Sequence, residues 1–395
     1  LRHLGRPRRS YAIPFTALAL LFAGLLVYQA TWQLTGLFRP QFLAFMQTYD
    51  RRQFNPAHRI RRGRILDHRG VVLAYSERHG DEVYRLYPFG PAFAHVVGYS
   101  DPKFGATGME AAANAHLNGG VAESLPAWGE LGRRLLTREK APKGQDLVLT
   151  LDAQLQLLAV QGLGSKRGAV VMQRPADGAI RVLANTPAFD PNRITAGLFK
   201  SNNPGAPLLN RATQGLYPPG STFKMLTAAL AIDKGFQGTL FCPADGYTTS
   251  TYYRKIRDHE FYEARKAGRT WKGHGDLDLA TALAQSSNVF FAQLGVRYGH
   301  DAFAGNIERF HFDREIPLYR SPYGSWAMRT GPVPQIKKRD KYGLAQASVG
   351  QGKVLATPAH MALITDAVAN QGVAVRPRLV QSDPPLQLDL FLPAS

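Results

Sequence analysis

The chain has 395 residues, of which 45% are hydrophobic and 19% are charged, so it can form two or three domains with a sizeable buried core and is not a disordered polymer. The formal net charge of +19 suits nucleic acid, an anionic membrane surface or an anionic cell-wall polymer. The single cysteine, Cys242, excludes an intramolecular disulfide and a cysteine-based metal cluster.

The first predicted element is a membrane-spanning helix at residues 11–32. Four arginines lie among the nine residues at the start of the chain, and the uncharged, mostly apolar run that follows is just long enough to cross a bilayer. The basic excess on the N-terminal side predicts a cytoplasmic tail over residues 1–10, with the bulk of the chain outside the cell membrane. No small-x-small cleavage site follows, so we expect an uncleaved anchor rather than a signal peptide. A buried core helix is the alternative, but the arginine-rich flank argues against it.

The next region, residues 33–143, is mixed and basic, with short strand-like segments. Two apolar runs within residues 62–74 predict a hairpin, because Asp67 can start a turn and Gly70 can adopt a positive φ. A helical pattern follows residues 105–110 and stops at Asn118-Gly-Gly. These patterns predict a small β-rich domain next to the membrane.

The third region, residues 144–395, alternates predicted strands and helices. A strand at residues 146–151 precedes a helix capped by Asp152, and residues 168–184 predict a hairpin with its turn at Asp177-Gly178. A hydrophilic insert at residues 252–272 is predicted to be a solvated loop rather than a binding patch.

The strongest chemical pattern is Ser221-x-x-Lys224. Pro218-Pro219-Gly220 cannot lie inside a helix, whereas residues 222–233 have a helical composition, so Ser221 is expected at a helix N-terminus. Ser is a favoured N-cap there. The three-residue spacing also brings Lys224 within reach of the Ser221 hydroxyl, as a nucleophile and its base require.

A second candidate motif is Ser286-Ser287-Asn288, where a helical pattern breaks and resumes. A hydroxyl at this turn can relay a proton, and the Asn288 amide can bind a substrate carbonyl or Lys224. Taken alone, such a triplet is more often a turn and a helix cap. Two motifs in this order are much less expected by chance.

Together, Ser221-x-x-Lys224 and Ser286-x-Asn288 resemble two signature motifs of penicillin-binding proteins and serine β-lactamases. The surrounding sequence resembles the class B penicillin-binding proteins, the membrane-anchored D,D-transpeptidases that cross-link peptidoglycan. The supporting segments are Arg62-Gly63-x-Ile65-x-Asp67, Gly108-Met-Glu110, Leu149-Thr-Leu-Asp152, Pro187-x-x-Asp190-Pro191-Asn192, Val349-Gly-Gln-Gly352 and Thr357-Pro358.

The resemblance implies an α+β fold with three parts: the single transmembrane helix, a small β-rich pedestal, and a transpeptidase domain with helices around an antiparallel sheet. It implies that Ser221 is acylated by stem peptides or β-lactams, with Lys224 as base, Ser286 as proton relay and Asn288 as ligand for the acyl side chain. It implies no cofactor and no metal. The implied partner is a membrane glycosyltransferase of the SEDS family, in the bacterial inner membrane.

One departure from the family pattern concerns the third motif. No Lys-Thr-Gly or Lys-Ser-Gly triplet occurs in the chain, and the one Lys-x-Gly triplet after Ser286 is Lys341-Tyr-Gly343. In the family this motif lies on an edge strand that supplies an oxyanion-hole N–H, whose loss costs about 10²–10³ in rate. We expect the transpeptidase domain to lack its last strands and helix, leaving the hairpin at residues 168–184 with an unpaired edge and an uncovered face. Either the sequence is a piece of a longer protein, the reading we favour, or the protein is a catalytically impaired scaffold.

Other classes of protein fit the sequence less well. A secreted β-lactamase has a cleavable signal and no pedestal. A metal hydrolase needs clustered ligands, whereas His259-Glu260 lacks a second histidine at helical spacing and His274 and His300 stand alone. A nucleic-acid-binding protein is supported by charge only, and the predicted membrane topology argues against it.

Overall fold

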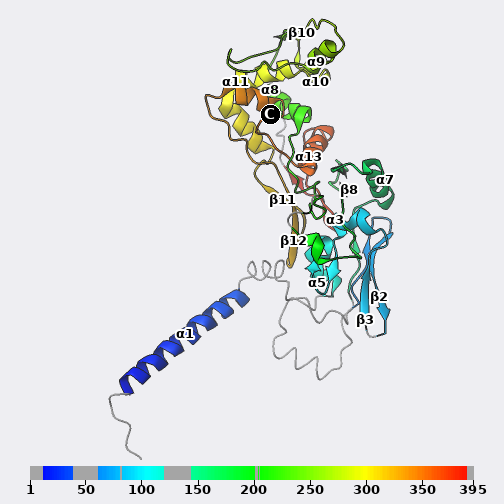
Figure 1. Cartoon of the computed structure of the whole chain (residues 1–395), viewed down its shortest axis with the longest axis vertical. Coiled ribbons are helices and arrows are strands. Elements are labelled where there is room, and N and C mark those ends of the chain that lie inside the picture. The colour runs from blue at the N-terminus through cyan, green and yellow to red at the C-terminus, as the bar shows by residue number, and fades with distance from the viewer. Residues whose placement is uncertain are drawn as a thin grey trace, which may run out of the picture. The chain divides into compact units, whose positions relative to one another are not determined.

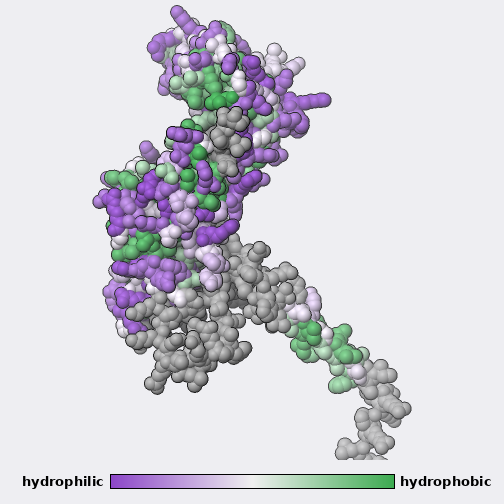
Figure 2. Space-filling view, turned by 180° about the vertical axis from the view of Figure 1, so that it is seen from behind, coloured by the Kyte–Doolittle hydropathy of each residue, from purple (hydrophilic) through white to green (hydrophobic). Residues whose placement is uncertain are grey.

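The computed structural model describes residues 12–38, 61–80, 82–119, 144–200, 203 and 205–388. The chain divides into two compact units, Leu1–Asn55 and Pro56–Ser395. The first unit contains helix α1 (Ala12–Phe38). Within it, the 18-residue segment Pro14–Thr31 has a mean hydropathy of 1.5, and none of its residues is buried by the rest of the protein. Figure 2 shows its surface as largely hydrophobic. By length and composition the helix can span a membrane, as expected; the predicted tail at residues 1–10 lies outside the described residues.

The second unit begins with a four-stranded sheet of order β3-β2-β1-β6. Strands β1 and β2 form the predicted hairpin: Asp67 accepts hydrogen bonds from the Arg69 and Val71 N–H groups, both at 2.8 Å, and Gly70 has a φ of +85°. The strands of this sheet are β1 (Ile65–Leu66), β2 (Val72–His79), β3 (Glu82–Leu86) and β6 (Leu147–Val148).

The strand predicted over residues 146–151 is shorter than expected. Only β6 is paired as a strand, in parallel with β1. Beyond it, the Leu149 N–H still donates to the Leu66 carbonyl at 2.8 Å, and the Leu151 carbonyl accepts from the His68 N–H at 3.0 Å. Leu149 forms an isolated antiparallel bridge with Val380, and the Thr150 N–H donates to the Leu379 carbonyl at 2.8 Å. Residues 149–151 thus lie between the β1 segment and the C-terminal part of the described chain and hydrogen-bond to both.

The helical pattern predicted to follow residues 105–110 and to stop at Asn118 is confirmed but interrupted, because the structure has two short helices separated at Ala113, whose φ is −105°. Arg62 donates a 2.9 Å hydrogen bond to the Glu110 carbonyl, the group that a continuous helix would bond to the Asn114 N–H. The small elements around this point are η4 (Gly90–Phe93), α3 (Ala94–Val97), β4 (Ser100–Asp101), β5 (Gly105–Ala106), α4 (Gly108–Ala112) and α5 (Asn114–Leu117).

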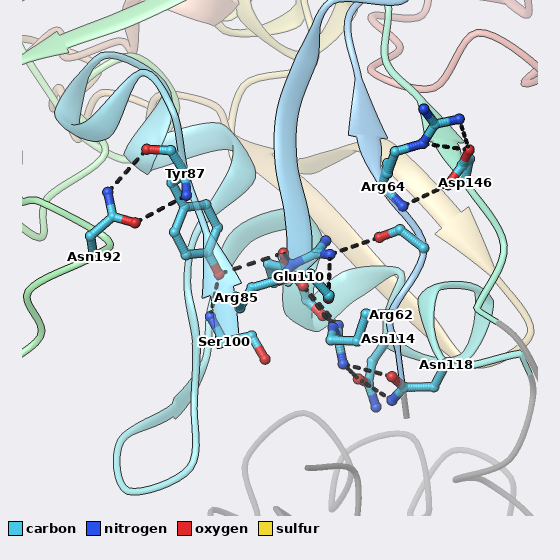
Figure 3. Close-up of polar contacts among 12 residues, drawn as sticks. Arg62, Arg64, Arg85, Tyr87, Ser100, Glu110, Asn114, Asn118, Asp146 and Asn192 are labelled. Carbon is cyan, nitrogen blue, oxygen red and sulfur yellow. Dashed lines mark hydrogen bonds and ion pairs between the residues drawn. The ribbon is translucent and has the colours of Figure 1, made fainter. Parts of the chain in front are cut away.

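A buried ion cluster fastens these helices to the pedestal sheet (Figure 3). The fully buried Glu110 carboxylate lies 2.8 Å from the Arg62 guanidinium and 2.7 Å from that of Arg85. Burial raises the pKa of Glu110, but the two arginines outweigh burial and hold its pKa below the ordinary value. The carboxylate therefore stays ionised and paired.

The transpeptidase region opens with helix α7 (Ala153–Leu163) and the antiparallel hairpin β7 (Gly168–Gln173) and β8 (Ile180–Thr186). Both predictions here are confirmed. Asp152 caps α7 by accepting from the Gln154 and Leu155 N–H groups at 3.0 and 3.1 Å, and Gly178 at the hairpin turn has a φ of +69°.

Two helices pack against this hairpin, α7 on β8 and α13 (Pro358–Ala369) on β7. Within the described residues β7 has β8 as its sole strand partner, and Leu158 of α7 and Met172 of β7 are 62% and 46% exposed. Among the described strands the expected unpaired edge of β7 is present. The expected uncovered face is not, because α7 and α13 contact the hairpin and β8 is mostly buried.

The remaining helices form a layer around α11 (Asn288–Arg309), which packs on α8 (Lys224–Asp233) and α12 (Lys341–Ser348) (Figure 1). Phe290 and Phe291 of α11 are fully buried in this layer. The other elements are η5 (Ala196–Phe199), η6 (Gly220–Phe223), β9 (Leu240–Cys242), α9 (His259–Lys266), β10 (Gly275–Leu277), α10 (Leu279–Ala284), β11 (Glu315–Ser321), β12 (Gly324–Arg329), β13 (Ala374–Val375) and β14 (Gln387–Leu388). The predicted mixture of helices and antiparallel sheet is confirmed.

Candidate active site

Ser221 lies on an exposed 3-10 turn, η6, immediately before helix α8. Its predicted place at a helix N-terminus is confirmed, but its side chain does not cap a helix. Pro219 occupies the N-cap position of η6 and Phe223 that of α8, and neither position has a side-chain cap hydrogen bond. The Ser221 hydroxyl is therefore not engaged with the helix backbone, and it faces Lys224 instead.

Lys224 is the first residue of α8 and is fully buried. Its Nζ lies 3.1 Å from Ser221 Oγ, 3.0 Å from Ser286 Oγ and 2.7 Å from Asn288 Oδ1, and it also donates to the Ser286 carbonyl. Burial lowers the pKa of Lys224 to about 8, against the opposing charges of Asp258 and Glu260. A neutral amine is thus accessible near neutral pH and can accept a proton from the Ser221 hydroxyl.

Ser286 and Asn288 belong to the turn between α10, which ends at Ala284, and α11, which begins at Asn288. Ser286 has a φ of +56°, in the left-handed region that residues with a side chain seldom adopt. This conformation directs both its carbonyl and its hydroxyl toward Lys224. The structure brings all four predicted site residues together around one amine.

The hydrophilic insert at residues 252–272 is more than a solvated loop. It contains helix α9, and Asp258 within it is 2% exposed. The Asp258 carboxylate accepts hydrogen bonds from Ser287 Oγ at 3.1 Å and from the Val289 N–H at 3.1 Å. Sequence reasoning missed this residue, because an aspartate before His259-Glu260 has the signature of an ordinary exposed N-cap.

The segment Val349-Gly-Gln-Gly352 fixes the turn that carries Ser221. The Gly220 N–H donates to the Gly350 carbonyl at 2.9 Å. Gly350 has a φ of +73°, and a Cβ there would lie 2.0 Å from the Gly220 carbonyl oxygen. Glycine is therefore required at position 350 for the two loops to approach.

The third family motif has no counterpart among the described strands. Lys341-Tyr-Gly343, the one Lys-x-Gly triplet after Ser286, opens helix α12 instead of forming a strand. The chemistry that the described site supports is therefore that of a serine nucleophile with a buried lysine base.

Two family models match the chain. The penicillin binding protein transpeptidase domain matches residues 168–387, and the penicillin binding protein A dimerisation domain matches residues 62–142. The first covers more than half of the chain, and it includes all four candidate site residues.

Known proteins of the same kind resemble the chain. It is 31% identical over 331 residues to peptidoglycan D,D-transpeptidase PbpA of Mycolicibacterium smegmatis, covering 79% of this chain and 64% of that protein. It is 31% identical over 336 residues to peptidoglycan D,D-transpeptidase MrdA of Acinetobacter baumannii, covering 75% of this chain and 48% of that protein. The chain thus spans about half to two thirds of the length of these curated relatives.

Among solved structures, the imipenem acyl-enzyme complex of penicillin-binding protein A from M. tuberculosis superimposes with a TM-score of 0.69 at 26% identity, covering 85% of this chain and 79% of that one. Sequence motifs, family models and fold agree. The chain therefore belongs to the penicillin-binding protein transpeptidase family.

Proposed function

We propose that this protein is a serine D,D-transpeptidase that cross-links peptidoglycan stem peptides and is acylated by β-lactams. One observation carries the proposal: the buried Lys224 amine lies 3.1 Å from the exposed Ser221 hydroxyl and is also bound by Ser286 and Asn288. Its relatives are named D,D-transpeptidases, and the solved neighbour is an imipenem acyl-enzyme.

In the first half of the proposed reaction, Ser221 Oγ attacks the carbonyl carbon of the penultimate D-alanine while neutral Lys224 takes the hydroxyl proton. The Ser221 N–H has the proposed role of stabilising the oxyanion, since the Gly220 N–H is already bonded to the Gly350 carbonyl. The peptide C–N bond then breaks, and terminal D-alanine leaves with a proton returned through Ser286. The product is an ester of Ser221.

In the second half, the amine of a neighbouring stem peptide attacks the ester carbonyl. Lys224 receives the amine proton, a new amide bond forms, and the Ser221 oxygen regains its proton as it leaves. A β-lactam follows only the first half, because its leaving nitrogen remains tethered to the acyl group. Asn288 has the proposed role of binding the acyl side chain.

The proposed location is the bacterial inner membrane, with the N-terminus cytoplasmic and the folded part outside. The apolar helix α1 and the arginine-rich sequence before it support this topology. The proposed partner is a membrane glycosyltransferase of the SEDS family, which α1 and the pedestal would contact. Co-purification of the two proteins from membranes, unchanged in Ser221→Ala, is expected; failure to co-purify would sink this part of the proposal.

The acylation is tested with a fluorescent β-lactam on the full chain. Wild type is expected to take a covalent label, and Ser221→Ala to take none. Thr222→Ala is the matched control, since Thr222 carries the exposed hydroxyl next in sequence, which donates to the Pro219 carbonyl at 2.8 Å. Equal labelling of wild type and Ser221→Ala contradicts the assignment of the nucleophile.

A further inference from the structure

A buried carboxylate lies beside the Ser286–Asn288 turn and has no part in the reaction as proposed. Asp258 directly precedes α9, but its side chain does not cap that helix. It is 2% exposed, and a carboxylate so placed is costly unless several donors satisfy it. Among the described residues, the hydrogen-bond donors to its carboxylate are Ser287 and Val289, at the start of α11.

Asp258 holds the first turn of α11. Ser287 Oγ donates to its two carboxylate oxygens at 3.1 and 3.2 Å, and the Val289 N–H donates at 3.1 Å. Ser287 Oγ also accepts from the Phe290 N–H at 3.1 Å, so the same hydroxyl caps the helix and binds the carboxylate. The start of α11 is thereby fixed to the insert.

The residue next to Asp258 orients the amide of the site. The Arg257 carbonyl accepts from Asn288 Nδ2 at 2.9 Å, which leaves Asn288 Oδ1 directed at Lys224 Nζ at 2.7 Å. Ser286 has a left-handed φ of +56°. It directly precedes Ser287 and Asn288, which Asp258 and Arg257 hold by hydrogen bonds. A strained turn persists only where its surroundings impose it.

Asp258 also acts on Lys224 through its charge. The charges of Asp258 and Glu260 raise the pKa of Lys224 and oppose the larger effect of burial. The other titratable groups around Asp258 are His274, whose Nε2 is 3.8 Å from Asp258 and 3.6 Å from Glu260, and Cys242, whose pKa burial raises to about 11. The thiol is neutral, so it does not add to the negative charge of Asp258.

We propose that Asp258 is a positioning residue for the Ser221–Lys224 pair, acting through Ser287 and Val289 to hold the Ser286–Asn288 turn on Lys224. The inference rests on the proposed function of that pair. It also assigns a role to the hydrophilic insert at residues 252–272. Through Asp258, this insert supports the Ser286–Asn288 motif, although Asp258 precedes Ser287 by 29 residues in the chain.

The experiment compares the full-length Asp258→Asn and Asp258→Ala variants. Titration of Lys224 is followed by NMR of ¹³C-labelled lysine, with its resonance identified as the one lost in Lys224→Arg. Loss of the carboxylate charge is expected to move the titration midpoint below the wild-type value of about 8 in both variants. The acylation rate with a fluorescent β-lactam is expected to fall about 10²-fold in Asp258→Ala. Asp258→Asn, which keeps an acceptor for Ser287 and Val289, is expected to lose less.

Glu263→Gln is the matched control, since Glu263 is an acid of the same insert with a 56% exposed side chain. It is expected to change neither the Lys224 titration midpoint nor the acylation rate. Thermal melting confirms that each variant is folded. An unchanged Lys224 midpoint in both Asp258 variants overturns the proposal. If wild type is not acylated but the midpoint still falls, the positioning role stands and the proposed function fails.

Discussion

At the residue scale, the site depends on removing one amine from water. Lys224 is fully buried between Ser221 and the Ser286–Asn288 turn, and this burial lowers its pKa to about 8. The sequence predicted the four site residues because their relations are local: a three-residue spacing on a helix, and a short break between two helices. It could not predict Asp258, because a contact between an insert and a helix 29 residues later leaves no periodic pattern.

The first prediction concerns the pH dependence of acylation. Only the neutral form of Lys224 can accept the Ser221 proton. The β-lactam acylation rate is therefore expected to rise with pH, with its midpoint at the Lys224 pKa of about 8. The profile is measured by stopped-flow or gel labelling between pH 6 and 9.5. Lys224→Arg, which stays charged over this range, is expected to be acylated at least 10²-fold more slowly. A rate independent of pH across this range would show that Lys224 is not the base.

At the scale of elements, short segments of the chain were predicted well where one residue decides the geometry. Asp152 caps α7 and Gly178 turns the β7–β8 hairpin, and both are visible in sequence. The interruption in the helical segment before Asn118 was not predicted, because it arises from Arg62, 48 residues away, which competes for a carbonyl within the segment. Local propensity cannot anticipate such a tertiary contact.

Helix α13 provides the second prediction. Asp366 on this helix is partly buried, and among the described residues its Oδ2 has no hydrogen-bond partner; burial raises the pKa of Asp366 to about 7. The folded state then binds more protons than the unfolded state from about pH 4 to 7, so stability falls as pH rises through this window.

Replacing Asp366 by Asn removes that penalty. After allowance for solvent screening, we expect Asp366→Asn to be stabilised by about 1–2 kcal/mol at pH 8 and by much less at pH 5. Denaturant unfolding at the two pH values measures the difference, with Glu263→Gln as an exposed acidic control. An equal effect at both pH values would mean that ionisation of Asp366 is not the cause.

At the scale of the whole second unit, the pedestal shares one hydrophobic core cluster with part of the transpeptidase region, while the helices around Lys224 pack in two further clusters. The core includes Ile65 and Val97 from the pedestal together with Leu363 of α13 and Val380. The two family models divide the chain near residues 142 and 168, whereas the packing does not. The sequence composition predicted two regions, residues 33–143 and 144–395. A change in composition along the chain does not indicate whether the apolar faces of two such regions pack together.

The third prediction tests this shared core through the pedestal ion cluster. Glu110→Ala leaves the buried Arg62 and Arg85 without their carboxylate, and we expect a loss of about 3–5 kcal/mol in the free energy of unfolding. Because the core is shared, the midpoint should shift in a single transition that also abolishes β-lactam labelling. Glu82→Ala, an exposed change on β3, should have little effect. A pedestal that melts separately while labelling persists would contradict the shared core.

The most direct test of the central claim, that Ser221 is a nucleophile served by Lys224, is to locate the acyl group itself. The full chain is incubated with a β-lactam, digested, and mapped by tandem mass spectrometry. We expect one modified peptide, carrying the intact β-lactam mass on Ser221, and no modification in Lys224→Arg over the same time. The absence of an adduct on wild type, or an adduct on another residue, would contradict the account.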